Sequence, residues 1–284
     1  MHVTAIFGPA ANEKELGAFR EDERLSWQPD ISPNTDANAA VIFGGDGTVH
    51  RHLQRLVELN LPLLVVPCGS GNDFAGALGI YSRKDALTAW KKFTAGDENV
   101  RTVDLGIVTP SATAESHYFC TIAGIGLDGE VLRRVNRLPR WFRGNGGYAL
   151  TLPPALFNFS AMSVKLSSPG STNDENGFHP ILLASFANTP AYGGGMKVAP
   201  KAKLDDGKLD ICVIREMNKL KLLSVFPSVY FGRHLGISGV EYSQAKSVRL
   251  ETREPFDVYA DGEHVCQTPV EISVKQAALR VIVP

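Results

Sequence analysis

Two glycine-rich segments, each carrying an aspartate, follow two short apolar runs near the start of the sequence. GGDGT (residues 44–48) comes after Val41 to Phe43, and GSGND (residues 69–73) comes after Leu63 to Val66. Apolar runs of this length and β-branched content are typical of buried strands. Because ligands bind outside the carboxyl ends of the strands in a parallel sheet, both segments are expected to face one binding site.

The residue types in these segments indicate what they would hold. Glycines allow close backbone approach, and the N–H groups at the start of a helix attract anions such as phosphate. Neither segment contains Lys or Arg, and neither fits the G-x-x-x-x-G-K-S/T pattern of a P-loop. Because Asp46 and Asp73 would repel phosphate without a divalent cation between them, the pattern favours a Mg²⁺-nucleotide site. The alternative is a pair of tight turns in an ordinary α/β domain.

Helical signals follow both segments. Apolar residues at helical spacing come after the first one: Val49, Leu53, Leu56 and Val57. Thr48 is the expected N-cap of that helix. A further helix is expected after Ser82, which forms a capping-box pattern with Asp85, and Gly96 is its expected C-cap.

Composition and charge narrow the class of protein. The chain has 284 residues, of which 44% are hydrophobic and 21% charged, and its net charge of −1 gives no overall bias toward nucleic acid. Its four cysteines are far apart and form no C-x-x-C pair, so a reduced, cytoplasmic protein is expected. The sequence shows neither a signal peptide nor an apolar run long enough to span a bilayer, so membrane contact is expected to be peripheral.

A change of pattern near residue 100 predicts two domains, 1–99 and 100–284. The first has the strand, loop and helix order of a parallel α/β nucleotide-binding domain. The second has many short runs with period-two alternation, which predict an antiparallel β-sandwich. Two helical inserts, Asp128 to Phe157 and Leu220 to His234, interrupt it. The strands expected in the second domain are Thr102–Val108, His117–Ile122, Met162–Leu166, Ile181–Ala187, Leu209–Ile214, Ser247–Glu251, Phe256–Ala260, Val270–Val274 and Leu279–Val283.

The first insert has the clearest charge asymmetry of the chain, because no Asp or Glu occurs from Val131 to Asn173. Apolar residues alternate there with five arginines: Arg133, Arg134, Arg137, Arg140 and Arg143. A basic amphipathic helix suits an anionic membrane surface, so the segment Arg133–Arg143 is a candidate for peripheral membrane contact. The alternative is a solvated helix packed on the sandwich. A nucleic-acid partner is not expected, because the positive charge is confined to one segment.

GGDGT after a strand, followed by PCGSGNDF at residues 67–74, resembles the diacylglycerol kinase catalytic family, which includes bacterial lipid kinases, sphingosine kinases and ceramide kinases. The resemblance runs from Val41 to Pro284. It implies an NAD kinase/diacylglycerol kinase-like fold and transfer of the ATP γ-phosphoryl group to a lipid hydroxyl, with diacylglycerol or a related lipid as acceptor. Two departures are visible. Ser70 replaces the usual Thr, and GPAA (residues 8–11) replaces the family's first turn, N-P-x-[SA]-G.

The resemblance also implies roles for individual residues, with ATP and Mg²⁺ as cofactors. The nucleotide would be held by Gly44, Gly45, Asp46, Gly47, Thr48, Gly69, Ser70 and Asn72. Asp46 and Asp73 would position Mg²⁺ or the acceptor hydroxyl. In the family's Asp-Gly-Glu motif, Asp261 or Glu263 would take the hydroxyl proton. Asp-Gly between two alternating strands is in any case a strong hairpin signal.

Two further segments acquire a meaning from the resemblance. The glycine-rich segment 188–196 would line the cleft between the domains. A structural Mg²⁺ would be bound near residue 206, by the Asp206 carboxylate and the carbonyls of Lys203 and Lys208. From spacing alone, the second segment is a surface turn.

Two other functions stay open at this point. An NAD kinase shares GGDGT and the two-domain plan, but it requires dinucleotide contacts and predicts no membrane affinity. A non-catalytic lipid-binding or regulatory member of the family, suggested by the altered first turn, predicts lipid association without nucleotide turnover. The sequence identifies neither the acceptor lipid nor the oligomeric state, for which a homodimer is one candidate.

Overall fold

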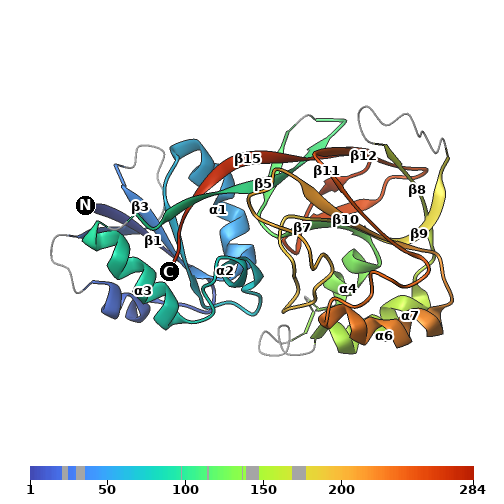
Figure 1. The fold of residues 1–284 in the computed structure, drawn as a ribbon, viewed down its shortest axis with the longest axis horizontal. Helices are drawn as coiled ribbons and strands as arrows, with labels where there is room; N and C mark the ends of the chain where they lie inside the picture. The colour runs from blue at the N-terminus through green and yellow to red at the C-terminus, as the bar shows by residue number, and fades with distance from the viewer. Residues whose placement is uncertain are drawn as a thin grey trace.

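The computed structural model describes residues 1–20, 25–29, 36–96, 98–113, 115–135, 137–138, 147–167 and 177–284. Two domains lie side by side, and both chain termini lie in the N-terminal one (Figure 1). The expected class, a parallel α/β domain followed by an antiparallel β-sandwich with helical inserts, is confirmed. No helix among the described residues is both long enough and apolar enough to cross a membrane.

A parallel sheet in the order β4-β3-β1-β2 forms the centre of the N-terminal domain. Every residue of β3 is buried, as a strand covered on both faces requires. The strands are β1 (His2–Phe7), β2 (Ser26–Pro29), β3 (Ala39–Gly44) and β4 (Leu63–Pro67), and the helices are the 3₁₀ helix η1 (Glu13–Phe19), α1 (Asp46–Leu59), α2 (Asp73–Ala77) and α3 (Arg83–Ala95).

The expected ends of α3 are confirmed. The Ser82 hydroxyl accepts the Asp85 N–H, the Asp85 carboxylate accepts the Ser82 N–H, and Gly96 ends the helix in the left-handed conformation. These caps depend only on neighbours in sequence, which is why the pattern predicted them.

The expected N-cap of α1 is wrong. The helix begins at Asp46 with Gly45 as its N-cap, and Thr48 lies inside the first turn. The Thr48 side chain fills the space next to two backbone glycines: an added Cβ would lie 2.6 Å from Thr48 Oγ1 at Gly8 and 2.7 Å from Thr48 Cβ at Gly44. Thr48 therefore packs against the backbone of Gly8 and Gly44, whereas the local sequence pattern predicted that it caps the helix.

The C-terminal domain is a β-sandwich with helices along one face. Its strands enclose a core that includes Phe119, Phe186 and Ile272. The two predicted inserts form α4 (Leu127–Val135), α6 (Gly147–Asn158) and α7 (Lys219–Tyr230), which pack on a second buried cluster (Figure 1). The strands are β5 (Val100–Pro110), β6 (His117–Phe119), β7 (Ile122–Gly126), β8 (Met162–Ser167), β9 (His179–Ala187), β10 (Leu209–Arg215), β11 (Val240–Ala245), β12 (Ser247–Thr252), β13 (Asp257–Ala260), β14 (Glu263–Gln267) and β15 (Val270–Ile282).

Several strand predictions are corrected. The run expected as one strand from His117 to Ile122 is broken at Cys120 and Thr121, which separates β6 from β7. β2 and β11 were not expected, and β14 was expected only as the second strand of the Asp-Gly hairpin, without bounds. β11 alternates between exposed and half-buried residues and pairs with β10 alone, so its apolar signal is weak. The two runs expected at 270–274 and 279–283 form the single strand β15.

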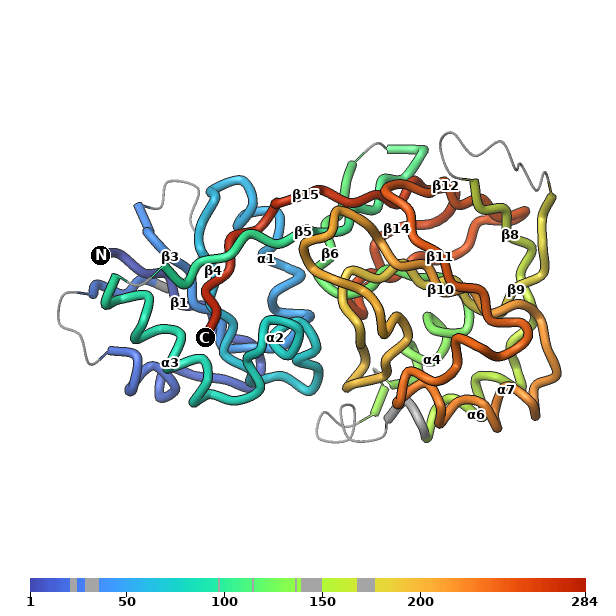
Figure 2. Tube along the Cα trace, in the orientation of Figure 1, coloured from blue at the N-terminus to red at the C-terminus, as the bar shows by residue number. Residues whose placement is uncertain are grey.

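β5 and β15 belong to both domains. They pair antiparallel from Val270–Pro110 to Ile282–Val100, and Figure 2 shows them passing together from one domain to the other. The end of β15 pairs with β4, and Leu279 is one of its residues in the N-terminal core. The sequence-based boundary assigned all of 100–284 to the second domain, whereas residues 279–283 pack with the first because the two strands return as a pair.

Leu279→Ala should lower the free energy of unfolding by about 2–5 kcal/mol, because the side chain is buried in the N-terminal core. Leu220→Ala is the matched control, since that leucine is exposed and its truncation should cost less than about 0.5 kcal/mol. Denaturant titration measures both values. Equal stability of the two variants would contradict the place of β15 in this core.

Candidate active site

The two glycine-rich loops pack directly on each other after β3 and β4. A Cβ on Gly45 would lie 2.3 Å from the Gly71 carbonyl oxygen, and one on Gly69 would lie 2.4 Å from the Gly45 Cα. The Asp46 N–H donates to the Gly71 carbonyl at 3.1 Å. Glycine is therefore required at 45 and 69 by the contact between the loops, independently of any ligand.

Asp46 connects the first loop to the helix that follows the second. Its carboxylate accepts the Asp73 N–H at 3.1 Å and the Phe74 N–H at 3.0 Å, at the start of α2. Desolvation and the charge of Asp73 outweigh these hydrogen bonds and raise the pKa of Asp46 to about 7. A carboxyl group with this pKa is stabilised in its ionised form by a nearby cation at neutral pH.

Asp73 connects the two domains. Its two carboxylate oxygens accept the N–H groups of Gly194 and Gly195, both at 2.9 Å. Desolvation raises the pKa of Asp73, and these two hydrogen bonds oppose the rise. The glycine-rich turn after β9 is thereby held against α2, and Tyr192 and Gly193 line the cleft as expected. The carboxylate that was expected to position Mg²⁺ or the acceptor thus also has a structural role.

The Asp-Gly-Glu motif forms the hairpin between β13 and β14, as predicted. Asp261 and Gly262 have φ values of 50° and 86°, which a two-residue type I′ turn needs. The buried Asp261 carboxylate accepts the Cys120 N–H at 2.9 Å, and the Thr121 N–H and hydroxyl at 2.7 and 2.5 Å. Burial raises its pKa, but these hydrogen bonds and a contact with His50 outweigh burial and lower the pKa of Asp261.

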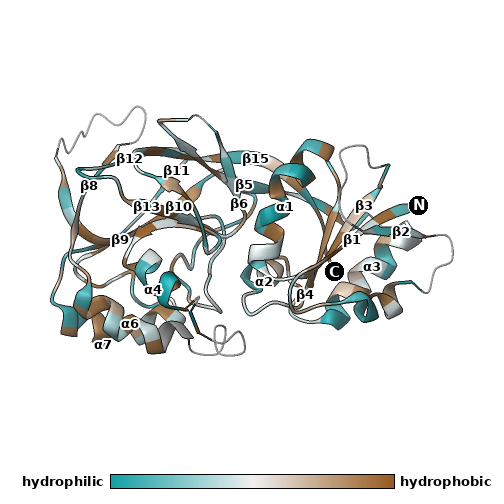
Figure 3. Cartoon of the chain, turned by 180° about the vertical axis from the view of Figure 1, so that it is seen from behind, coloured by the Kyte–Doolittle hydropathy of each residue, from teal (hydrophilic) through white to brown (hydrophobic). Residues whose placement is uncertain are grey.

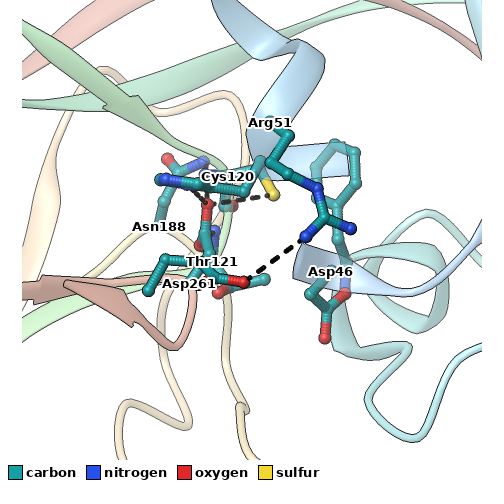
Figure 4. Close-up of polar contacts among 9 residues, drawn as sticks. Asp46, Arg51, Cys120, Thr121, Asn188 and Asp261 are labelled. Carbon is teal, nitrogen blue, oxygen red and sulfur yellow. Dashed lines mark hydrogen bonds and ion pairs between the residues drawn. The ribbon is translucent and has the colours of Figure 1, made fainter. Parts of the chain in front are cut away.

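α1 supplies the residues that face this hairpin. His50 Nδ1 lies 3.0 Å from Asp261 Oδ2, and Arg51 Nη1 lies 3.9 Å from Glu263 Oε1. Burial disfavours the charged form of His50, but the hydrogen bond and charge of Asp261 and the charge of Glu263 outweigh it and raise the His50 pKa. In Figure 4, Arg51 and Asp46 lie on one side of the site, and Asp261 lies on the other with Cys120 and Thr121. Sequence analysis missed His50, although its position one helical turn after Asp46 was the available signal.

Asp46, Arg51, Asp261 and Glu263 line one cleft of about 770 Å³ between the domains, whereas Asp73, which the sequence placed among the catalytic residues, is not one of its lining residues. Its size is typical of small-molecule sites, which range from about 300 to 1,000 Å³. The altered first turn, residues 8–10, also lines it. All the nucleotide-binding residues expected from the sequence line it, as do both candidate bases: Gly44, Gly45, Asp46, Gly47, Thr48, Gly69, Ser70, Asn72, Asp261 and Glu263.

Ser70 and Asn72 have different places in this cleft. Ser70 is exposed at its rim, where its hydroxyl is free to meet a ligand. Asn72 closes its own loop: its side-chain oxygen accepts the Gly69 N–H, and its side-chain amide donates to the Gly69 carbonyl, both at 2.9 Å. Its contribution to binding is therefore the shape of the loop.

A buried acid that the sequence did not predict lies next to Tyr192, which lines the cleft. Asp128, at the start of α4, accepts a hydrogen bond from the Tyr192 hydroxyl. Burial raises the pKa of Asp128 to about 6, and the tyrosine opposes the rise. Tyr192 lines the cleft together with Leu132 and Val135 of α4, so this end is largely apolar. The two partners are 64 residues apart, and no local pattern connects them.

The expected structural metal residues lie outside this cleft. Lys203, Asp206 and Lys208 belong to the turn before β10, and none of them lines the cleft. One Asp206 oxygen accepts the Lys208 N–H at 3.1 Å. Within the described part of the chain, no group of three His, Cys, Asp or Glu side chains is placed to hold a metal ion.

The basic segment is less available than its sequence indicated. Arg133 and Arg134 both pair with Glu130, one helical turn earlier on α4. Arg140 and Arg143 lie outside the described residues. Glu130, which pairs with the first two arginines, lies one residue before the stretch 131–173 that lacks Asp and Glu.

His50→Ala should destabilise the protein most at acidic pH. Because the folded-state pKa of His50 is raised above 6.5, its stabilisation is fully present below pH 6.5 and is lost as pH rises through the folded pKa. Denaturation midpoints of wild type and variant, measured across this range, should converge as pH rises. His264→Ala is the control, because that ring lies at the surface, 3.3 Å from Asp257. A pH-independent difference would contradict the assignment.

Two domain models match this chain. Residues 30–108 match the diacylglycerol kinase catalytic domain, and residues 121–283 match the YegS C-terminal NAD kinase beta sandwich-like domain. The chain is 34% identical over 269 residues to the diacylglycerol kinase of Mycobacterium tuberculosis, an alignment that covers 95% of this chain and 84% of that protein.

Solved structures share the fold. A diacylglycerol kinase from Bacillus anthracis str. Sterne has a TM-score of 0.69 and 21% identity, covering 100% of this chain and 97% of that one. An NAD kinase from Archaeoglobus fulgidus, solved in complex with ATP, has a TM-score of 0.56 and 14% identity, covering 99% and 93%. At these identities the structures show the fold alone. The domain matches and the Mycobacterium relative show more: the chain belongs to the diacylglycerol kinase family of lipid kinases.

Proposed function

We propose that this protein transfers the γ-phosphoryl group of ATP to the hydroxyl group of a lipid, diacylglycerol or a close relative. The observation that carries the proposal is the shared cleft, in which the glycine loops of one domain face the Asp-Gly-Glu hairpin of the other. The loops supply an anion-binding end, and the hairpin supplies carboxylates for the acceptor. Membership of a lipid kinase family supports the reaction class.

The phosphate end is formed by residues 44–48 together with Ser70. α1 begins at this loop, so its first N–H groups and helix dipole favour an anion there. Asp46 stands beside them and would repel a bare nucleotide. The residues fit Mg²⁺-ATP, because an ion between the phosphates and Asp46 would compensate both charges, and Mg²⁺ would neutralise charge that develops on the transferred phosphoryl group.

The acceptor end contains the two candidate bases. Asp261 is buried and ionised, but its oxygens already accept several hydrogen bonds, which lowers its basicity. Glu263 is 48% exposed at the cleft, and its contact with Arg51 is long. One of these two carboxylates takes the acceptor proton, a role that contributes about 100- to 10,000-fold in rate.

The competing functions have less support. The fold fits an NAD kinase, but identity to the diacylglycerol kinase of Mycobacterium tuberculosis is 34%, against 14% to the Archaeoglobus NAD kinase. A non-catalytic member was suggested by the first turn. Gly8 nevertheless donates its N–H to the Phe43 carbonyl at 2.8 Å and packs against Thr48, so the turn still forms part of the cleft wall.

Three variants test the reaction with labelled ATP, Mg²⁺ and hydroxyl lipids in mixed micelles. Asp46→Ala should remove lipid phosphorylation, because the glycine loops and the cation would lose their shared carboxylate. Asp261→Asn and Glu263→Gln should each be measured, and the base is the residue whose change lowers kcat by about 100-fold or more without lowering the stability of the protein. Asp205→Ala, an exposed aspartate that pairs with Arg101 outside the cleft, is the control.

The outcomes separate the functions. Product that disappears with Asp46→Ala identifies the kinase and its lipid together. Absence of product with every lipid, combined with absence of ATP binding, would leave a non-catalytic member of the family. Phosphorylation of NAD in place of a lipid would establish the other enzyme.

We also propose that Asp206 and the carbonyls of Lys203 and Lys208 bind a structural Mg²⁺. One carboxylate and two carbonyls are hard oxygen ligands, and Mg²⁺ usually keeps several waters besides such groups. Mg²⁺ should raise the thermal midpoint of the protein, and Asp206→Asn should remove most of that increase. Asp205→Asn is the neighbouring control. An unchanged Mg²⁺ response in Asp206→Asn would refute the site.

A further inference from the structure

The C-terminal domain exposes large apolar side chains on one pair of neighbouring helices. Leu150 and Phe157 of α6 are 57% and 52% exposed, Leu220 of α7 is 66% exposed, and Phe231 at its end is 71% exposed. These are four of the seven large apolar side chains that are exposed among the described residues. Exposed apolar residues gathered in this way mark interaction sites, whereas single ones are ordinary.

The four side chains form one surface, because both helices lie on the same core. Leu152 and Leu156 of α6 and Leu222 and Val229 of α7 are buried in one cluster, so the opposite sides of both helices face solvent together. Lys219 Nζ donates to the Phe157 carbonyl at 2.9 Å and joins the two helices. In Figure 3 the α6–α7 pair forms the outer layer of this domain and carries brown, hydrophobic stretches on both helices.

Each helix presents its exposed residues at helical spacing. On α6 they are Leu150, Pro154 and Phe157, three and four residues apart. On α7 the exposed row is Leu220, Ser224, Pro227 and Phe231, again three and four residues apart. We call these two rows the α6–α7 surface.

The charged residues of α6 and of the segment 219–233 have one sign. α6 contains no charged residue, and the segment 219–233 contains Lys219, Lys221 and Arg233 but no Asp or Glu. Lys221 and Arg233 are exposed. An apolar surface whose two helices carry only cations complements an anionic lipid layer, in which apolar side chains enter the interface and cations meet head groups.

We propose that the α6–α7 surface docks this protein on an anionic membrane. This inference rests on the proposed lipid kinase function, and it names the partner of the same site. The surface lies one helix away from the apolar end of the cleft. Leu132 and Val135 of α4 line the cleft, and both also belong to the core on which α6 and α7 pack. Docking here would place the α4 side of the cleft next to the membrane that holds the acceptor.

In the described part of the basic segment, Arg133 and Arg134 pair with Glu130, which cancels part of their charge, and Arg137 is exposed. The α6–α7 surface combines exposed apolar groups with cations, and a peripheral membrane site needs both.

Binding to vesicles tests the proposal without any use of kinase activity. Full-length protein is sedimented with vesicles of phosphatidylglycerol and phosphatidylcholine, and with vesicles of phosphatidylcholine alone. Wild type should bind the anionic vesicles and lose affinity as salt rises. The double variant Leu220→Ser, Phe231→Ser should bind about tenfold more weakly or worse. Lys221→Glu should weaken binding to anionic vesicles only.

Tyr81→Ser is the matched control, because Tyr81 is 79% exposed but lies on the N-terminal domain. It should bind vesicles as wild type does. Equal binding by wild type and the double variant would overturn the proposal. So would a wild-type dimer that the double variant converts to a monomer in light scattering, since the surface would then cover a second copy of the chain.

A paired activity assay separates this inference from the proposed function. The double variant should keep wild-type activity on lipid dispersed in detergent micelles and lose activity on vesicles. If vesicle binding requires the α6–α7 surface but the wild type has no activity on micelles, the docking proposal stands and the kinase proposal is refuted. If the wild type is active on micelles but the double variant binds vesicles as well as wild type does, the kinase proposal stands and the docking proposal is refuted.

Discussion

Two carboxylates hold the cleft together by accepting hydrogen bonds across the domain boundary. Asp73 of the N-terminal domain binds the N–H groups of Gly194 and Gly195, and Asp261 of the C-terminal domain contacts His50. Hydrogen bonds to charged groups contribute about 1.5–3 kcal/mol each. A few of them are significant against the roughly 5–15 kcal/mol that stabilises a typical domain. Together with β5 and β15, which pass from one domain to the other, these contacts keep the glycine loops facing the hairpin.

The same carboxylates give the cleft its electrostatic character. Asp46, Asp261 and Glu263 line it, and Arg51 is the single Lys or Arg among its described lining residues. The pKa of Asp46 is raised to about 7, because burial removes water from its charged form and Asp73 carries a like charge nearby. A cleft with this charge repels a free polyphosphate and accepts one that carries a divalent cation. The charge pattern therefore agrees with the proposed nucleotide, which would enter as its Mg²⁺ complex.

The sequence predicted the features that depend on neighbours in the chain. The strand before each glycine loop, the capping box at Ser82 and the Asp261-Gly262 hairpin all follow from local periodicity and turn chemistry, and all are confirmed. It also brought the two glycine loops to one cleft, because parallel strands bring their loops to one edge of a sheet.

The sequence did not predict the features that depend on packing between distant segments. Thr48 resembles a helix cap in sequence, yet its neighbours in space are Gly8 and Gly44. The partnership of Asp128 with Tyr192 and the return of β15 to the N-terminal sheet likewise join residues far apart in the chain. The glycines at 45 and 69 have a second role that the sequence did not show, since they pack against each other's loops as well as line the cleft.

Several residues of the cleft have a structural and a chemical role at once, and this determines how their variants must be interpreted. Removing Asp73 would release the turn at Gly194, so lost activity would not show that Asp73 touches the cation or the acceptor. Asp261 has the same ambiguity, because it orders Thr121 and the start of β7. Glu263 is half exposed and makes only a long contact with Arg51. A loss of turnover at Glu263 without a loss of stability would therefore report chemistry, and it is the residue at which the base can be assigned with least ambiguity.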